Sequence, residues 1–303
     1  MKTYTLEDGR KVQSRAPTAG FNPLTANAVE LERNGFPAVP DHGEHKDRFV
    51  RVYSLIRNKF HYVEPTFRVN KDRSHGRRIR AQSAGTQTST NWSGAVVTPP
   101  AGDSFKWMEG DWTVPNVDAP TENQWYYCAS WIGIDGDGSN DVFQAGVETE
   151  VYRSGNSITR NCYAWWEWYP EGEVQITNLE VSPGDMITML LCSSSPTAGT
   201  VYFTNRTTGA STSVGLTAPS GTKLVGNCAE WIVEAPTVNG QQSAIADYGE
   251  VFFSVCEAVT QKGVTVNGGT GDNINMTANG TVVSDGMLIA PTVVECLYAG
   301  SVP

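Results

Sequence analysis

The chain has 303 residues and a formal net charge of −10 at pH 7. Residues 1–85 hold 16 Lys and Arg against 9 Asp and Glu, a charge of +7, while residues 86–303 hold 6 against 23, a charge of −17. All four histidines lie in the first part, which excludes Ser-His and Cys-His catalysis in the second and argues against a His-ligated metal there. The charge of −17 also argues against nucleic-acid binding, so an enzyme in this part must use carboxyl groups for proton transfer.

Composition divides the chain into two parts with different roles. Residues 86–303 are rich in Gly, Thr, Ser, Val and aromatic side chains, and they contain all nine Trp and all six Cys. This composition is typical of an all-β sandwich or barrel built as one domain. Residues 1–85 are too polar to form a robust core of their own. The uncompensated carboxylates of the second part predict an acidic working environment, because protonation relaxes their mutual repulsion.

The first part contains two expected helices. Residues 25–34 form a short one that ends at Asn34-Gly35. Residues 47–60 form a basic amphipathic one, in which apolar side chains recur at three- and four-residue steps from Phe49 to Phe60. Its basic face either is simply solvated or binds a membrane surface or an acidic partner. The acidic second part of the same chain is the simplest such partner.

A basic stretch, residues 71–80, leads into the polar run 81–90. We expect an exposed, protease-accessible linker here, with the boundary between the two parts near residue 85. The amino terminus lacks the apolar segment of a signal peptide, and no run of the sequence is long and apolar enough to span a bilayer. We therefore expect no membrane partner.

From residue 91 onward the pattern is one of strands and turns. Residues 107–114 alternate as a half-buried strand does, and two β-rich runs, 173–181 and 185–192, flank the turn signal Ser182-Pro183-Gly184. Further strands are expected at 200–204, 230–234, 251–255, 264–266 and 282–289. No repeat of fixed length is present, so the prediction is two packed, curved antiparallel sheets. The spacing of the six cysteines leaves disulfide formation open.

One carboxylate, Glu167, lies among five aromatic residues in the run Tyr163-Ala-Trp-Trp-Glu-Trp-Tyr169. In a strand, Trp165, Glu167 and Tyr169 share one face. A glutamate on such a face indicates a cleft. The alternative is an edge strand whose glutamate reaches water.

Two other runs carry polar residues on expected strands. In Ala229-Glu-Trp-Ile-Val-Glu234, alternation places Glu230 and Glu234 on one face, where desolvation would raise a carboxyl pKa toward values useful for acid–base catalysis. In Trp131-Ile-Gly-Ile-Asp135-Gly136, Asp135 is either a site residue or part of a hairpin turn. Gln144, in Phe143-Gln-Ala-Gly146, is either a site residue or an ordinary polar strand residue. Spacing alone does not decide between these readings.

Six motifs follow one another along the second part of the chain. They are Asn91-Trp-Ser-Gly-Ala95, Trp131-Ile-Gly-Ile-Asp-Gly136, Phe143-Gln-Ala-Gly146, Ala164-Trp-Trp-Glu-Trp-Tyr-Pro170, Ser182-Pro-Gly-Asp185 and Ala229-Glu-Trp-Ile-Val-Glu234. In combination and in this order, they resemble the motifs of the glutamic peptidases, also called eqolisins. The resemblance spans about residues 89–255. Tyr163 departs from the pattern, because members of the family typically have Asp there. The cysteine positions of the family do not map onto these six.

The resemblance implies an all-β, lectin-like antiparallel β-sandwich of jelly-roll type (residues 86–303) that follows a basic, partly helical propeptide (residues 1–85). It implies an acid-acting endopeptidase, secreted into an acidic environment, that needs no cofactor or metal and cleaves protein or peptide substrates. By resemblance the catalytic pair is Gln144 and Glu234. Four further residues match positions that line or support the active site of the family: Trp131, Asp135, Trp165 and Glu167.

Peptide hydrolysis by such a pair follows simple chemistry. Ionised Glu234 takes the proton of a water and returns it to the leaving amine, while the amide of Gln144 donates to the oxyanion. The charge partition adds a hypothesis about residues 1–85, which we expect to act as an intramolecular inhibitor with the amphipathic helix near the cleft. Acidification would neutralise carboxylates and weaken this docking, after which the linker is cut.

Three other classes compete with this reading. A β-sandwich glycoside hydrolase would use paired carboxylates and aromatic side chains, but no closely spaced Glu-x-Asp-x-Glu run is present. A carbohydrate-binding module would explain the tryptophan-rich face without catalysis. A pepsin-like aspartic protease is disfavoured because the sequence contains no Asp-Thr-Gly or Asp-Ser-Gly.

Overall fold

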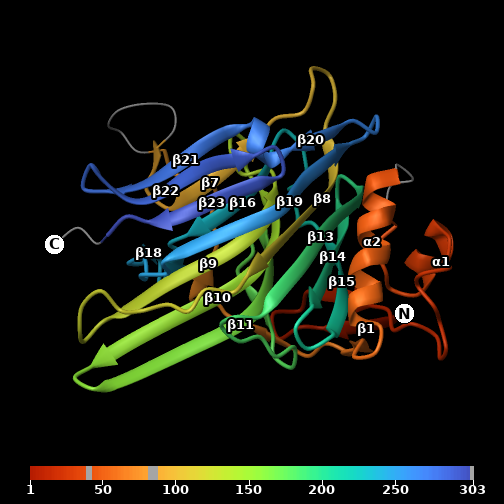
Figure 1. Ribbon diagram of the computed structural model, residues 1–303, viewed down its shortest axis with the longest axis horizontal. Coiled ribbons are helices and arrows are strands. Elements are labelled where there is room, and N and C mark those ends of the chain that lie inside the picture. Colours follow the sequence, from red (N-terminus) through yellow and green to blue (C-terminus); the bar gives the residue numbers. More distant parts are fainter. Residues whose placement is uncertain (39–42, 81–87, 301–303) are drawn as a thin grey trace.

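The computed structural model describes residues 1–38, 43–80 and 88–300, so His42 and residues 81–87 of the expected linker lie outside the described residues. Two antiparallel sheets pack face to face in the region from residue 88 onward (Figure 1). The predicted β-sandwich is confirmed. The helices of the described chain, apart from one short 3-10 turn (η1, Gly268–Thr270), lie in the N-terminal segment, as expected.

Six neighbouring strands form the main part of the first sheet. In spatial order they are β12 (Val174–Ile176), β11 (Ser157–Tyr169), β10 (Val142–Ser154), β9 (Trp125–Ile134), β16 (Ala229–Glu234) and β7 (Trp92–Val97). The alternating apolar and polar residues of these strands give the sheet one face toward the core and one face away from the second sheet, which we call the outer face.

The second sheet covers the inner face of the first. Its strands, in spatial order, are β15 (Ala210–Thr217), β14 (Ala198–Asn205), β13 (Met186–Ser195), β8 (Phe105–Thr113), β19 (Glu250–Thr260), β23 (Val293–Tyr298), β22 (Thr281–Ala290) and β21 (Asp272–Ala278). A short strand, β20 (Thr265–Asn267), pairs with β19. β21 also pairs with β7, so it joins the two sheets.

The strand expected over residues 173–181 is present only in its first part. The β-rich runs 173–181 and 185–192 were expected to flank a turn, but β12 ends at Ile176 and belongs to the first sheet, whereas β13 belongs to the second. The turn at Ser182–Asp185 is present, with the Asp185 N–H donating to the Ser182 carbonyl over 3.0 Å. The chain therefore uses this turn to cross between the layers.

The core between the sheets is rich in aromatic side chains. Met108 and Trp112 of β8, Trp231 of β16, and Trp166 and Trp168 of β11 belong to one buried cluster, and each is less than 3 % exposed. Burial of each large ring contributes about 1.5–3 kcal/mol, before the entropy of ordering the chain is subtracted. All six cysteines, each within the described chain, are free thiols.

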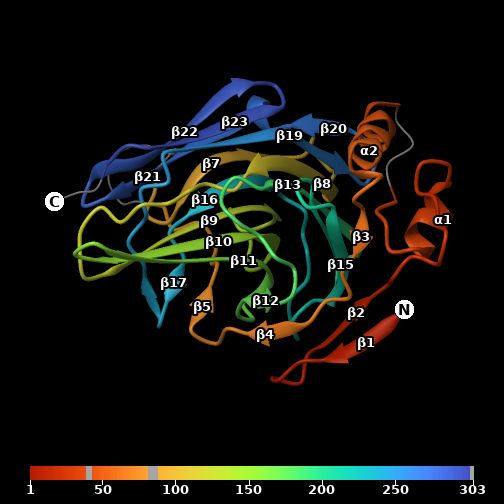
Figure 2. The ribbon, with the colours of Figure 1, turned by 60° about the horizontal axis from the view of Figure 1, so that its bottom comes forward.

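The N-terminal segment wraps around the sandwich instead of forming a separate body (Figure 2). Its strands are β1 (Lys2–Thr5), β2 (Lys11–Ser14), β3 (His61–Tyr62), β4 (Phe67–Val69) and β5 (Arg73–Ser74). β2 and β3 pair with β15, β4 extends the first sheet by pairing with β12, and β5 pairs with β17 (Thr237–Val238), which forms a hairpin with β18 (Gln241–Gln242). β6 (Thr88–Ser89) pairs with β21.

Both expected helices are present, and each is shorter than or shifted from its predicted range. α1 (Ala28–Arg33) begins at Asn27, whose side chain accepts a hydrogen bond from the N–H of Glu30 while Glu30 reaches back to Asn27. α2 (Gly43–Ile56) lies on the far side of the second sheet, where Arg48 forms ion pairs with Glu109 (2.6 Å) and with Glu257. The prediction that this helix lies near the cleft is therefore wrong, since the polar residues of the cleft belong to the first sheet.

The expectation of an exposed linker is also wrong for the central part of residues 71–80, although both ends of this stretch and Arg77 are exposed. His75 is completely buried, and the side chains of Arg73 and Arg78 are only 15 % and 3 % exposed. The segment is held because its basic side chains meet carboxylates of the sandwich, Glu150 and Asp137, at 3.0 and 2.8 Å. A basic charge run thus serves as a binding strand and not as a solvated connection.

Candidate active site

The outer face of the first sheet carries the two residues expected to form the catalytic pair. Gln144 lies on β10 and Glu234 on β16, with β9 between them. In the register of these strands, Gln144 is opposite Gly133 and Glu234 is opposite Ala129 of β9. Both side chains are completely or almost completely buried, at 0 % and 1 % exposure.

Glu234 is held by donors on both oxygens. The indole N–H of Trp131 donates to Oε2 over 2.9 Å, and the side-chain amide of Asn91 donates to Oε1 over 3.2 Å. The ring of His75 approaches the same carboxylate, with Nδ1 3.5 Å from Oε2. Burial raises the pKa of Glu234, and these donors and the charge of His75 partly oppose the shift.

A glycine on β10 allows Trp131 to reach this position. A Cβ at Gly146 would lie 2.4 Å from the Cβ of Trp131 and 2.4 Å from the Ser130 carbonyl oxygen. The Gln-Ala-Gly sequence of β10 therefore leaves room for the indole that orients Glu234.

Gln144 points its amide at the backbone of the N-terminal segment. Its Nε2 donates a short hydrogen bond to the carbonyl oxygen of His75. Its Oε1 is buried and has no hydrogen-bond partner within the described residues. The side chain thus offers a donor to a peptide carbonyl and keeps an acceptor free.

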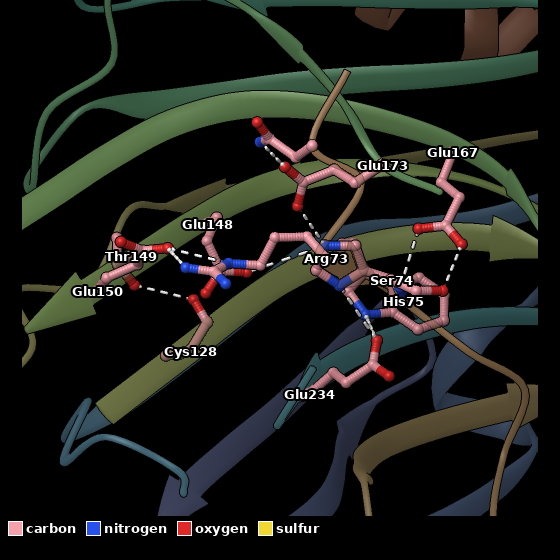
Figure 3. A network of polar contacts seen from close by, with 12 residues as sticks. Arg73, Ser74, His75, Cys128, Glu148, Thr149, Glu150, Glu167, Glu173 and Glu234 are labelled. Carbon is pink, nitrogen blue, oxygen red and sulfur yellow. Dashed lines mark hydrogen bonds and ion pairs between the residues drawn. The ribbon is translucent and has the colours of Figure 1, made fainter. Parts of the chain in front are cut away.

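Glu167, on β11, contacts the same short segment (Figure 3). Trp165 of the same strand also contacts it. The ring of His75 stacks on Trp165 with centroids 3.6 Å apart and planes 8° from parallel. Glu167 accepts hydrogen bonds from the Ser74 hydroxyl (2.9 Å) and from the His75 N–H (2.8 Å). Burial raises the pKa of Glu167 to about 8, against the opposing influence of His75.

Asp135 has a different position from the other expected residues. Its carboxylate accepts from the backbone N–H groups of Val225 (2.6 Å) and Asn227 (2.8 Å), and so it anchors the loop that leads into β16. Burial raises the pKa of Asp135. Its contribution to the site is thus to support the strand that carries Glu234.

Glu230 shares the outer face of β16 with Glu234, as the alternation predicted. Its side chain is completely buried, and neither oxygen has a hydrogen-bond partner within the described chain. Burial raises the pKa of Glu230 well above its usual range, so this carboxyl is neutral at acidic pH. No donor corresponding to Trp131 or Asn91 orients it.

Sequence reasoning missed three residues of this site: His75, Glu148 and Glu173. Glu173 accepts from His75 Nε2 over 2.8 Å, and Glu148 lies 3.9 Å from the same nitrogen. Glu148 follows Gln144 by four positions on β10, so strand alternation could have placed it on this face. Glu173 lies in the turn before β12, and His75 in the basic stretch, where no periodic signal is available.

The ring of His75 lies among carboxylates. Burial disfavours its charged form, but its contacts with Glu173 and Glu234 outweigh burial and raise the pKa of His75 well above its usual value. The ligand atoms of His75, Glu148 and Glu173 lie within 4.8 Å of one another, a spacing that a metal ion could use. A protonated imidazole has no lone pair for a metal, so the arrangement fits an ion-pair cluster better.

A family comparison agrees with this geometry. The model of the peptidase A4 family matches residues 90–298. Aspergillopepsin-2 from Aspergillus niger is 32% identical over 215 residues, which cover 65% of this chain and 73% of that protein. Scytalidopepsin B from Scytalidium lignicola is 27% identical over 230 residues, which cover 73% of this chain and 82% of that protein.

Solved structures with the same fold are also glutamic peptidases. Scytalido-glutamic peptidase bound to a transition state analog inhibitor matches with a TM-score of 0.60 and 27% identity, over 69% of this chain and 98% of that one. The eqolisin SCP-B in complex with the tripeptide Ala-Ile-His gives 0.57 and 25% over the same shares. Aspergilloglutamic peptidase from Aspergillus niger gives 0.53 and 29%, over 57% and 99%.

The chain belongs to the peptidase A4 family, the glutamic peptidases or eqolisins. It is a hydrolase of peptide bonds, and this decides against the glycoside hydrolase and the carbohydrate-binding module. No helix within the described ranges is long and apolar enough to cross a membrane.

Proposed function

We propose that the protein is an acid-acting endopeptidase with Glu234 and Gln144 as its catalytic pair, and that residues 1–85 are its inhibitory pro-segment. The observation that carries this proposal is that both side chains contact one residue of that segment. Gln144 donates to the backbone carbonyl of His75, and Glu234 lies 3.5 Å from its ring.

The pair supplies the groups that hydrolysis of a peptide needs. Ionised Glu234 takes a proton from water and later gives it to the leaving amine. The amide of Gln144 donates to the oxyanion that develops on the carbonyl oxygen, and its free Oε1 accepts from the water. Trp131 and Asn91 donate to Glu234 and hold it in one orientation.

The way in which residues 73–76 lie in the cleft supports their role as an inhibitor. Arg73 and Ser74 form an antiparallel pair with β17, and Glu167 accepts from the N–H of His75. Strand pairing of this kind is how an extended peptide substrate is commonly bound. SCP-B was solved with the tripeptide Ala-Ile-His, and the tripeptide Arg73-Ser74-His75 also ends in histidine.

Ion pairs give the docking of the pro-segment a dependence on pH. Arg48 pairs with Glu109 at 2.6 Å, Arg73 with Glu150 at 3.0 Å, and Arg78 with Asp137. Lowering the pH reduces the total negative charge of residues 86–303, whereas the arginines keep their charge, so the attraction between the two parts weakens. The segment then becomes accessible to cleavage, in agreement with a secreted protein that works in an acidic environment.

The test uses the purified full-length chain and a denatured protein substrate near pH ~4, where glutamate titrates. Wild-type protein is expected to lose its N-terminal segment on a gel and then to hydrolyse the substrate. The variants Glu234→Gln and Gln144→Ala are expected to keep their circular dichroism spectra and lose both reactions. Full activity in either variant contradicts the pair, and full activity while the segment remains attached and docked contradicts the inhibitor.

A further inference from the structure

The side chain of His75 occupies a small enclosed subsite next to the catalytic pair. The face of Trp165 forms one wall, 3.6 Å from the imidazole ring between centroids. Glu173 lies 2.8 Å and Glu148 3.9 Å from Nε2. All four side chains are completely buried.

The subsite can be assigned relative to the bond that is cleaved. Gln144 donates to the carbonyl oxygen of His75, and in hydrolysis this donor faces the carbonyl that is attacked. His75 therefore stands where the substrate residue preceding the cleaved bond stands. The next residue, Gly76, supplies the leaving amine in this alignment.

The subsite lacks a positive charge of its own once the pro-segment leaves. Both oxygens of Glu148 are buried without a hydrogen-bond partner within the described residues, and they face the ring of His75. The side chain of Glu173 is shared by His75 and Asn70, and both of these belong to the N-terminal segment. Removal of that segment leaves two buried carboxyls close together. Burial and the neighbouring Glu173 raise the pKa of Glu148 well above its usual range, so Glu148 is a neutral neighbour and Glu173 is the group that pairs with a cationic occupant.

We propose that Glu148 and Glu173, over the face of Trp165, form the specificity subsite for the residue preceding the cleaved bond, and that this subsite selects a cationic side chain, histidine above all. This inference rests on the proposed catalytic pair. A planar imidazolium fits because it can stack on the indole and donate from Nε2 to Glu173 at the same time. An acidic side chain would meet two carboxyls.

The reaction selected in this way is an ordinary hydrolysis. Water adds to the carbonyl carbon of the cationic residue, and Glu234 takes the proton of the water. The C–N bond then breaks, and the same proton passes to the departing amine. The products are a peptide that ends in the cationic residue and a peptide with a new amino terminus.

The experiment compares internally quenched peptides that copy residues 70–80 and differ only at the position of His75, which is His, Phe or Glu. Acid-treated full-length protein is assayed near pH ~4, where the histidine is charged. We expect kcat/KM for the His peptide to exceed that for the Phe and Glu peptides by about tenfold or more. In Glu173→Gln the ratio of His to Phe should fall to about twofold or less, with an unchanged circular dichroism spectrum as proof of folding.

Two further variants test whether the preference for histidine depends on the subsite carboxyls and not on any glutamate nearby. Glu148→Gln should reduce the same ratio, while the exposed Glu180→Gln should leave it unchanged. Equal rates for the His and Phe peptides, or a preference that survives in both Glu173→Gln and Glu148→Gln, would overturn the subsite and leave the catalytic pair standing. Absence of hydrolysis of every peptide and of denatured protein would overturn the catalytic pair and the subsite together.

Discussion

The side-chain amide of Gln144 donates a hydrogen bond to the backbone carbonyl of His75, which lies 69 residues earlier in the chain. This contact connects the first sheet to the N-terminal segment. In the proposed mechanism, the carbonyl oxygen at this position is the atom on which the oxyanion develops. Glu234 lies 3.5 Å from the ring of the same residue. The proposal takes this arrangement as the way in which a substrate is bound, and the first two predictions below depend on it.

Removal of the Gln144 amide should impair the chemical step more than binding. Gln144→Ala deletes the donor to the oxyanion, and loss of one such donor costs about 2.7–4 kcal/mol of barrier, or about 10²–10³ in kcat. KM should change little, because strand pairing and the side-chain subsites remain. Steady-state kinetics on one quenched peptide checks this. A variant whose kcat is unchanged would remove Gln144 from the mechanism.

Acid treatment should cut the chain after His75. The carbonyl that Gln144 holds belongs to the bond between His75 and Gly76, so this is the bond presented to Glu234. Mass spectrometry of acid-treated full-length protein should find a fragment that begins at Gly76. The uncleaved Glu234→Gln chain is the control. If wild-type protein becomes active while this bond stays intact in every molecule, the alignment is wrong.

The buried Glu167 should make the folded chain less stable as pH rises. Burial raises its pKa to about 8 in the folded chain, whereas a carboxyl of this type has a pKa of about 4.3 when unfolded. The folded state holds a proton that the unfolded state has lost between these values. Its contribution to stability is therefore fully present below about pH 4 and is lost as the pH rises toward about 8.

Glu167→Gln mimics the protonated form and should flatten this dependence. We expect the fall in Tm between about pH 5 and about pH 8 to be smaller in the variant than in wild-type protein. Differential scanning calorimetry at both pH values measures the change, with the exposed Glu180→Gln as the matched control. The same fall in Tm in wild type and Glu167→Gln would show that Glu167 does not titrate in this range.

A tryptophan side chain of the core forms a hydrogen bond between the two sheets. The indole N–H of Trp231, on β16, donates to the carbonyl oxygen of Glu109, on β8, over 2.9 Å. Trp231→Phe removes this donor and leaves a small cavity, at a cost of about 2–4 kcal/mol in the free energy of unfolding. Urea unfolding measures it, with the partly exposed Trp125→Phe as control. A urea midpoint of Trp231→Phe equal to that of wild-type protein would contradict a stabilising role for this hydrogen bond.

The face on which each strand residue lies could be predicted, because successive side chains of a β-strand point to opposite faces of the sheet. Trp165 and Glu167 share the outer face and Trp166 packs in the core, as the period of two requires. The strand predicted over 173–181 was too long, because the β-rich composition of this run continues past Ile176, where the strand ends. There the N–H of Thr177 and the side chain of Asn178 bind the N-terminal segment, and the strand ends.

The position of residues 71–80 could not be predicted from local pattern. Their basic side chains suggested a solvated linker, but the partners that bury them are far away in the sequence. Glu150 lies 77 residues after Arg73, and Glu173 lies 98 residues after His75. The charge partition between the two parts indicated that they attract each other. The net charges of the two parts do not indicate which basic residue binds beside Gln144 and Glu234.

The central claim is that Glu234, and not Glu230 on the same face of β16, performs the proton transfers. The most direct test measures kcat/KM on one quenched peptide near pH ~4 for Glu234→Gln and Glu230→Gln, each checked for folding by circular dichroism. Because Glu230 is buried without donors and neutral, its amide should be tolerated. The account predicts a loss of about 10²–10⁴-fold for Glu234→Gln and a change of less than about threefold for Glu230→Gln. Equal losses in both variants, or retained activity in Glu234→Gln, would contradict it.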